Sequence, residues 1–180
     1  MFHNNLKNPE TRKTIALLGA FCLFLSAIEF MIPKPMPFLR IGIANLPLMM
    51  ALYILPFRHY LVLVGIKILG QAIITGSLFS YIFLFSLTGT LLSALTMYGL
   101  RSILGQERIS YIGIGTAGAI ISNISQIALA WIFIFGNSIR VIAPPFFAAG
   151  IITGISLGVF CELFTQRSQW YAEKIKVYSK

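Results

Sequence analysis

The chain has 180 residues, of which 57% are hydrophobic and only 11% charged, and its formal net charge is +9 at pH 7. A water-soluble domain of this length has too little interior to bury so much apolar surface, so the composition excludes a soluble globular fold and predicts a membrane protein.

Six apolar windows follow one another along the chain, separated by charge, proline or glycine. A helix that crosses the hydrocarbon core of a bilayer needs about 20 such residues. We therefore predict an all-α, polytopic membrane bundle with six transmembrane helices in residues 15–164, between a cytoplasmic segment (1–14) and a basic cytoplasmic tail (165–180). The predicted spans are Ile15–Ile32, Ile41–Leu55, Tyr60–Leu78, Tyr81–Leu100, Ile109–Phe135 and Val141–Phe164.

The first two windows are joined by the stretch IEFMIPKPMPFLRIGIANLPLMM, Ile28–Met50, which gathers many of the scarce polar residues. The first window is too long for a cleaved signal peptide and is followed by further spans. The second is short and contains Pro47. We therefore expect the second span to be tilted, kinked or partly unwound.

Glycines occur at structurally informative positions in the third to sixth windows. A tight turn near TGSLFSY separates the third from the fourth, and the fifth opens with GIGTAG. That spacing fits a dinucleotide-binding loop but lacks the strand and soluble βαβ unit that such a loop needs, so we predict helix packing instead. The sixth window carries Gly150, Gly154 and Gly158, four apart, which predicts a flat strip for another helix.

The distribution of Lys and Arg predicts the orientation. With the amino terminus inside, only Lys34, Arg40 and Arg140 lie outside, which favours an even number of crossings with both termini in the cytoplasm. Nucleic-acid binding is not expected, because no soluble domain carries a basic face. The ten residues that fall on the cytoplasmic side are Lys7, Arg12, Lys13, Arg58, Arg101, Arg108, Arg167, Lys174, Lys176 and Lys180.

Ionisable and amide side chains inside the spans are the candidate binding residues, since a charge at the bilayer centre costs about 3 kcal/mol on insertion scales. They map to the middle or outer half of the bilayer, and we predict an outward-opening pocket with a cationic rim. Such a pocket suits a ligand with an anionic or polar head and a flat or apolar body. The alternative is that these residues are structural. Lys67 would then snorkel or form a structural pair, and the amides would hold helices together. The predicted set is Glu29, Lys34, Arg40, Asn45, Lys67, Gln71, Asn123, Gln126 and Arg140.

No catalytic, metal or cofactor site is predicted. All five acidic residues are glutamates, whereas prenyl diphosphate chemistry needs clustered carboxylates, typically aspartates, to hold Mg²⁺. His3 and His59 lack companions at metal-ligand spacing, and no nucleotide-binding loop is present, so another subunit must power any uphill transport. Cys22 and Cys161 are expected to be small core residues rather than a disulfide.

Six short-looped spans, the Ala16-x-x-x-Ala20 pair and an outward polar pocket resemble the S component of energy-coupling factor (ECF) vitamin transporters. More narrowly, the Ile28–Met50 stretch resembles the signature of the Gx transporter family, whose members often carry the label heptaprenyl diphosphate synthase component I. The resemblance implies a non-catalytic membrane subunit that captures a small vitamin-like ligand and pairs with a transmembrane coupling protein and two cytoplasmic ATPases. It also implies that Ala16 and Ala20 dock on the coupling protein, that the Pro33–Arg40 loop closes over the ligand and that Asn45 faces the pocket.

Two other functions stay open at this point. The chain could be a membrane partner of a quinone, isoprenoid or flavin redox system without transport activity, with a quinone or prenyl tail in its cavity. The other open function is that of a literal prenyl diphosphate synthase component, although the lack of aspartates argues against it.

Overall fold

The computed structural model describes residues 9–33, 42–105 and 108–178, and this part of the chain is helical without any strand. The side chains of 176–178 are not described. The helices are α1 (Pro9–Met31), η2 (Ile43–Asn45), α2 (Leu46–Ala51), α3 (Phe57–Ile74), α4 (Tyr81–Leu104), α5 (Tyr111–Ala130), η3 (Trp131–Phe135), η4 (Gly136–Ser138), α6 (Ile139–Arg167) and α7 (Gln169–Tyr178). An all-α fold was predicted, and it is confirmed for the described residues.

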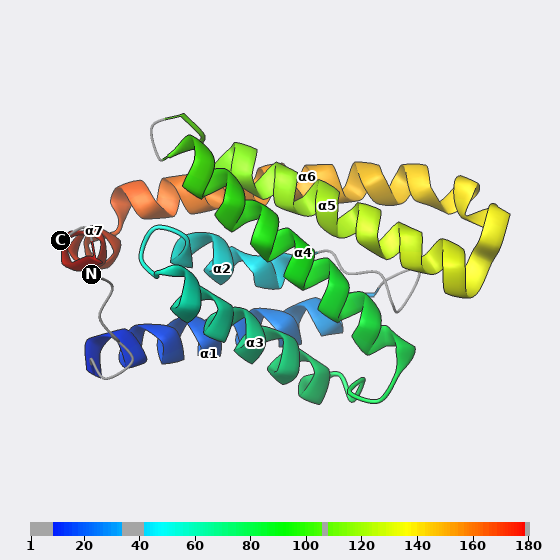
Figure 1. Cartoon of the computed structure of the whole chain (residues 1–180), viewed down its shortest axis with the longest axis horizontal. Coiled ribbons are helices and arrows are strands. Elements are labelled where there is room, and N and C mark those ends of the chain that lie inside the picture. The colour runs from blue at the N-terminus through cyan, green and yellow to red at the C-terminus, as the bar shows by residue number, and fades with distance from the viewer. Residues whose placement is uncertain (1–8, 34–41, 106–107, 179–180) are drawn as a thin grey trace.

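The long helices run roughly lengthwise through the molecule (Figure 1). α1, α3 and α5 run in one direction, and α4 and α6 run in the other. The start of α1 lies at the same end as α7, which we call the α7 end. The turn between α3 and α4 and the reversal between α5 and α6 lie toward the opposite end, the far end. The chain reverses between α5 and α6 near Gly136. Its φ of 50° is a backbone conformation that a residue with a Cβ rarely adopts.

Four apolar helical stretches are long enough to cross a membrane: Pro9–Met31, Phe57–Ile74, Tyr81–Leu104 and Tyr111–Arg167. The last contains both α5 and α6, which lie antiparallel beside each other in Figure 1. The chain is therefore a helical membrane protein, although its helices do not form six full-length spans.

The predicted second span is wrong as a full-length helix. In the described part of this window, residues 42–55, the helices are a 3₁₀ turn and the six-residue α2, and six residues of α helix rise about 9 Å, far less than a bilayer core. Pro47 lies in the first turn of α2, where its missing N–H is tolerated, and every residue of α2 is buried. The expectation that this span is partly unwound is confirmed, and α2 belongs to the core of the bundle rather than to its lipid-facing surface.

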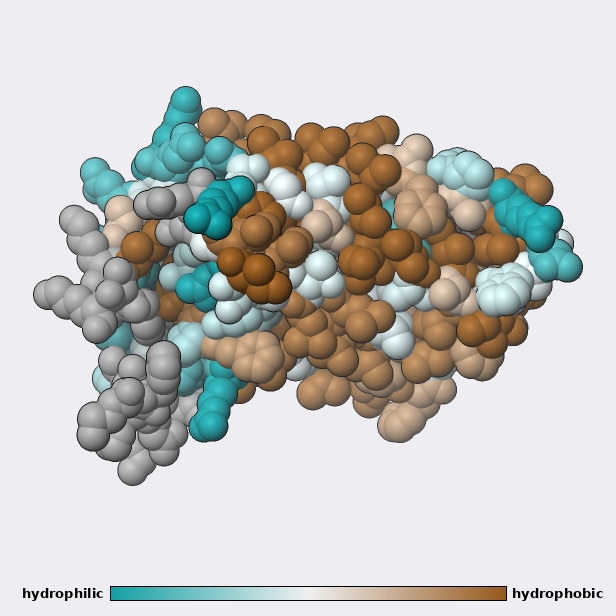
Figure 2. All heavy atoms as spheres, turned by 45° about the horizontal axis from the view of Figure 1, so that its top comes forward, coloured by the Kyte–Doolittle hydropathy of each residue, from teal (hydrophilic) through white to brown (hydrophobic). Residues whose placement is uncertain are grey.

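The surface around the long helices is apolar. Large side chains such as Phe24, Ile73, Phe133 and Val141 are exposed. Figure 2 shows a mainly brown middle with the teal, hydrophilic residues gathered toward the two ends. This distribution is what a bilayer requires of a helical bundle, because lipid replaces water around the middle.

Glycines let α5 and α6 pack closely, as the sequence predicts. A Cβ on Gly158 would lie 2.5 Å from Cα of Ile112, and one on Gly154 would lie 2.8 Å from Cβ of Ala119. On the α5 side, a Cβ on Gly115 would lie 2.8 Å from the Gly154 carbonyl oxygen. The glycines of GIITGISLG therefore form a packing surface, and Gly115 of the GIGTAG motif is part of the same contact.

We expect Gly158→Ala to destabilise the bundle, because the added methyl group meets backbone atoms of α5 that cannot rotate away. Overpacking of this kind costs about 1–3 kcal/mol. The matched control is Gly65→Ala in the middle of α3, where nothing lies within 4 Å of the added Cβ and the better helix propensity of alanine should leave stability unchanged or raise it. Thermal unfolding in detergent, followed by tryptophan fluorescence, compares the two; equal midpoints would contradict the packing assignment.

A helix that the sequence analysis did not predict, α7, closes the α7 end. Tyr171 is 1% exposed, and its hydroxyl group is hydrogen-bonded to that of Tyr111 on α5. Burial raises the pKa of the Tyr171 phenol, so the group stays protonated in this contact. An ion pair of 3.0 Å between Lys174 and Glu10 connects α7 to the start of α1.

Candidate ligand-binding site

A cluster of buried polar side chains lies inside the bundle, where five segments of the chain meet. The residues come from α1, from the turn Gly42–Asn45 and from α3, α4 and α5. They surround a cavity of about 10 Å³, roughly enough for one water molecule. The lining residues are Glu29, Gly42, Asn45, Lys67, Gln71, Phe85, Ser86, Gly89, Thr90, Ser122 and Gln126.

Glu29, near the end of α1, is 1% exposed, and its carboxylate is held by backbone groups. The N–H of Gly42 donates to Oε1 at 3.2 Å, and the N–H of Ala44 donates to Oε2 at 3.3 Å. Gly42 has φ of 94°, in the left-handed region where glycine is favoured. This backbone conformation and the 2.9 Å hydrogen bond from the Asn45 N–H to the Gly42 carbonyl oxygen form the turn that reaches Glu29.

Lys67 on α3 supplies the opposite charge, and its side chain is also buried, with 3% exposed. Its ammonium group donates to Oδ1 of Asn45 at 2.9 Å and to Oγ1 of Thr90 on α4 at 2.7 Å. One carboxylate and one ammonium group therefore line the same small cavity. A buried charge is tolerated only where polar partners replace its water, and the hydrogen bonds to Lys67 and Glu29 do so here.

Amide side chains form the other side of the cavity. Gln71, one turn after Lys67, accepts a hydrogen bond at 3.3 Å from the Ser86 hydroxyl group on α4. Gln126 on α5 donates at 3.0 Å to the hydroxyl group of Ser122, one turn earlier on the same helix. The site thus offers both hydrogen-bond donors and acceptors to whatever it holds.

A second cavity of about 20 Å³ adjoins the first and shares Gly42, Asn45 and Ser122 with it. Asn123 lines this second cavity and donates to the Phe146 carbonyl oxygen of α6 at 3.3 Å. Ser93 lines it too; its side chain is 1% exposed, and its hydroxyl group has no hydrogen-bond partner among the described residues. Such a group is costly to bury and is available to a bound molecule.

The structure brings most of the predicted site residues together. Glu29, Asn45, Lys67, Gln71 and Gln126 line one cavity, and Asn123 lines the adjoining one. Lys34 and Arg40 lie outside the described residues. Arg140 is exposed at the start of α6 and lines neither cavity, so the structure does not place it with the others.

Four hydroxyl residues of the site were missed by the sequence analysis: Ser86, Thr90, Ser93 and Ser122. Ser86, Thr90 and Ser93 recur at intervals of four and three and therefore share one face of α4, but this spacing does not show that the face lines a site. Ser122 lies one turn before Gln126 on α5.

The described polar groups lie close together and leave two cavities of about 10 and 20 Å³. The outward opening and its cationic rim stay a prediction, because Lys34 and Arg40 lie outside the described residues. The physical reason is that a dry, unpaired carboxylate or ammonium group is unfavourable, so the Gly42–Asn45 turn packs against both charges.

We expect Asn45→Ala to destabilise the protein by about 1–3 kcal/mol, because it removes an acceptor from the buried Lys67 ammonium group. Arg140→Ala, at an exposed position, should change stability by less than about 0.5 kcal/mol. Unfolding midpoints of the two variants in the same detergent give the comparison. If Arg140→Ala were the more damaging change, the cavity would not be the polar centre of the fold.

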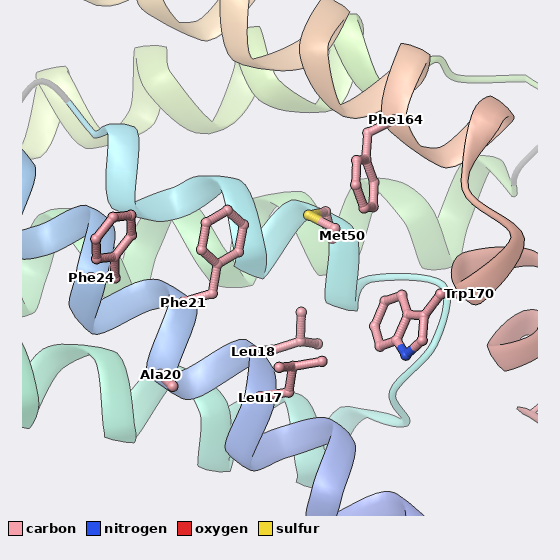
Figure 3. Close-up of a pocket in the computed structure, with 8 residues that line it drawn as sticks. All are labelled: Leu17, Leu18, Ala20, Phe21, Phe24, Met50, Phe164 and Trp170. Atoms are coloured by element: carbon pink, nitrogen blue, oxygen red, sulfur yellow. The ribbon is translucent and has the colours of Figure 1, made fainter.

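An apolar groove of about 470 Å³ lies near the α7 end, outside the polar cluster. Figure 3 shows its walls: Leu17, Leu18, Ala20, Phe21 and Phe24 come from α1, Met50 from α2, Phe164 from α6 and Trp170 from α7. Ala16 and Ala20, the predicted partner interface, are both exposed on α1, and Ala20 lines the groove. The small residues therefore face outward rather than into the bundle.

Comparison with known proteins identifies one family. A family model described as heptaprenyl diphosphate synthase component I matches residues 18–164. No curated protein and no solved structure matches the chain.

Proposed function

The chain belongs to the heptaprenyl diphosphate synthase component I family, and on that premise we propose that it is the substrate-binding membrane subunit, the S component, of an ECF-type transporter. In this function it captures a small vitamin-like or precursor molecule from outside the bacterial plasma membrane, with both termini in the cytoplasm.

One observation carries the proposal: polar side chains from five segments converge inside an otherwise apolar bundle. Holding helices together does not require a carboxylate and an ammonium group in one cavity, because neutral amides and hydroxyl groups serve that purpose at lower cost. Buried ionisable groups in membrane proteins are most often part of a binding or transport path. The cavity next to Glu29 and Lys67 is therefore the proposed ligand site.

The exposed face of α1 supports a partner in the membrane. Ala16 and Ala20 lie on this face, and the large side chains of Leu17 and Phe24 beside them are also exposed. Small residues at an interval of four let another helix approach closely. We propose that a transmembrane coupling protein docks here, and that cytoplasmic ATPases act through it.

Prenyl transfer by this chain is not part of the proposal, in spite of the family description. The sequence contains no aspartate, and among the described residues no group of three or more His, Cys, Asp or Glu residues lies close enough to hold a metal ion. Binding of a diphosphate through Mg²⁺ needs several carboxylate oxygens. The polar groups at the site instead fit the recognition of a ligand by hydrogen bonds.

Purification of the tagged chain from its native membranes tests the proposal. We expect a second membrane protein and two ATPases to co-purify in mild detergent, and ATP hydrolysis in the complex to be coupled to release of a bound small molecule. Turnover of isoprenyl diphosphates by the isolated chain with Mg²⁺ would contradict it, as would co-purification of a flavin-bearing redox partner in place of ATPases.

A further inference from the structure

The turn Gly42–Asn45 is bound to both charges of the cavity at once. It gives one N–H to each oxygen of Glu29, from Gly42 and Ala44, and the Asn45 side-chain oxygen accepts from the Lys67 ammonium group. Four consecutive residues thus present two donors to the carboxylate and one acceptor to the cation. A molecule that takes the place of this turn replaces these three hydrogen bonds only if it offers the same pattern of two donors and one acceptor.

We propose that the ligand of this site is a planar heterocycle whose edge carries two adjacent N–H donors beside a carbonyl oxygen, the pattern of a 2-amino-4-oxopyrimidine ring. This inference rests on the proposed function and specifies its substrate class. The two N–H groups bind the two oxygens of Glu29, and the carbonyl oxygen binds Lys67.

The charges determine the order of the groups along that edge. A carboxylate only accepts hydrogen bonds and an ammonium group only donates them, so the ligand cannot present an acceptor to Glu29 or a donor to Lys67. Two parallel N–H groups on a rigid ring match a carboxylate in a bidentate manner, which strengthens the contact and makes it directional. An aliphatic amine or a simple carboxylate satisfies only one of the two charges.

The remaining lining of the site suits the body of such a ring. Phe85 lines the first cavity beside the charged groups, and its ring offers an apolar contact. In the adjoining cavity the Ser93 hydroxyl group has no hydrogen-bond partner among the residues that the structure describes, so a polar substituent of the ligand can reach a free partner. Gly42 and Asn45 of this turn line both cavities, so a ligand that takes the place of the turn borders both.

Two isomeric probes test the proposed pattern on the purified full chain. Isocytosine, which is 2-amino-4-oxopyrimidine, carries two N–H donors beside a carbonyl oxygen, whereas cytosine has the same atoms with one donor beside two acceptors. We expect isocytosine to raise the unfolding midpoint in a saturable way and to bind at least about tenfold more tightly than cytosine, because cytosine presents an acceptor where the Glu29 carboxylate requires a donor. Equal shifts from the two isomers, or no shift from isocytosine, would overturn the proposal.

Two variants test whether isocytosine binds at this site. Glu29→Gln introduces an amide that no longer accepts two N–H groups, so the preference for isocytosine should disappear, while Glu162→Gln on α6, which lines neither cavity, should keep it. If Glu29→Gln does not fold, the comparison of isocytosine with cytosine on the unmodified chain still tests the proposed ligand pattern. A chain that co-purifies ATPases but shows no isocytosine preference would refute only the ligand class, whereas a preference without any transport partner would refute only the transporter role.

Discussion

Replacing Lys67 with methionine lowers the free energy of unfolding by about 3 kcal/mol, the cost of breaking a buried charge arrangement from one side. The methionine has similar length but no charge. It removes the ammonium group that lines the cavity together with the Glu29 carboxylate, and with it the donor that Asn45 and Thr90 share. Thermal unfolding in detergent, followed by the fluorescence of the tryptophan residues, measures the loss.

A double-mutant cycle shows whether the two charges act together. Glu29→Gln alone should also destabilise, whereas Glu29→Gln combined with Lys67→Met should cost less than the sum, because the opposite charges of these two lining residues are then removed together. Lys13→Met, which removes an exposed cation near the start of α1, is the control and should change little. Strict additivity of the two cavity variants would contradict a shared electrostatic environment.

The second large effect is expected on assembly rather than on stability. Ala16→Leu together with Ala20→Leu should abolish co-purification of the coupling protein, because two bulky side chains on the exposed face of α1 keep a second helix from approaching. Both positions face away from the bundle, so the fold and the polar cavity should be unaffected. The readout is the amount of partner recovered with the tagged chain.

Ala149→Leu is the matched control for that experiment. It changes the same residue type at an exposed position of α6, and Ala149 does not line the groove. We expect normal recovery of the partner with this variant. If the double variant of α1 also retained its partner, the docking face would lie elsewhere on the molecule.

The long helices could be predicted because each is an apolar window that ends at charge, proline or glycine. α2 could not, since its length depends on packing: its residues are as apolar as those of the spans, but all of them are buried by neighbouring helices. α7 was missed for a related reason. Its sequence is short and mixed, and the helix is held by the contacts of Tyr171 with Tyr111 and of Lys174 with Glu10, two partners far away in the chain.

The ionisable and amide residues of the site could be predicted because such groups are rare inside a membrane span. The hydroxyl residues could not be separated from ordinary ones. Ser26 and Thr116 donate to carbonyl oxygens one turn earlier in their own helices, as serine and threonine commonly do, whereas Thr90 accepts from Lys67 on another helix. Sequence spacing alone does not distinguish these two roles, and it gives no measure of how tightly the groups close on one another.

Mass spectrometry of the intact protein, released from detergent under gentle conditions, tests most directly whether the polar cavity holds a ligand. We predict that the protein carries one small water-soluble molecule, that Glu29→Gln reduces its occupancy and that Glu162→Gln does not. A protein that carries only lipid or a quinone, or a bound molecule whose occupancy is the same in both variants, would contradict the assignment of this cavity as the binding site.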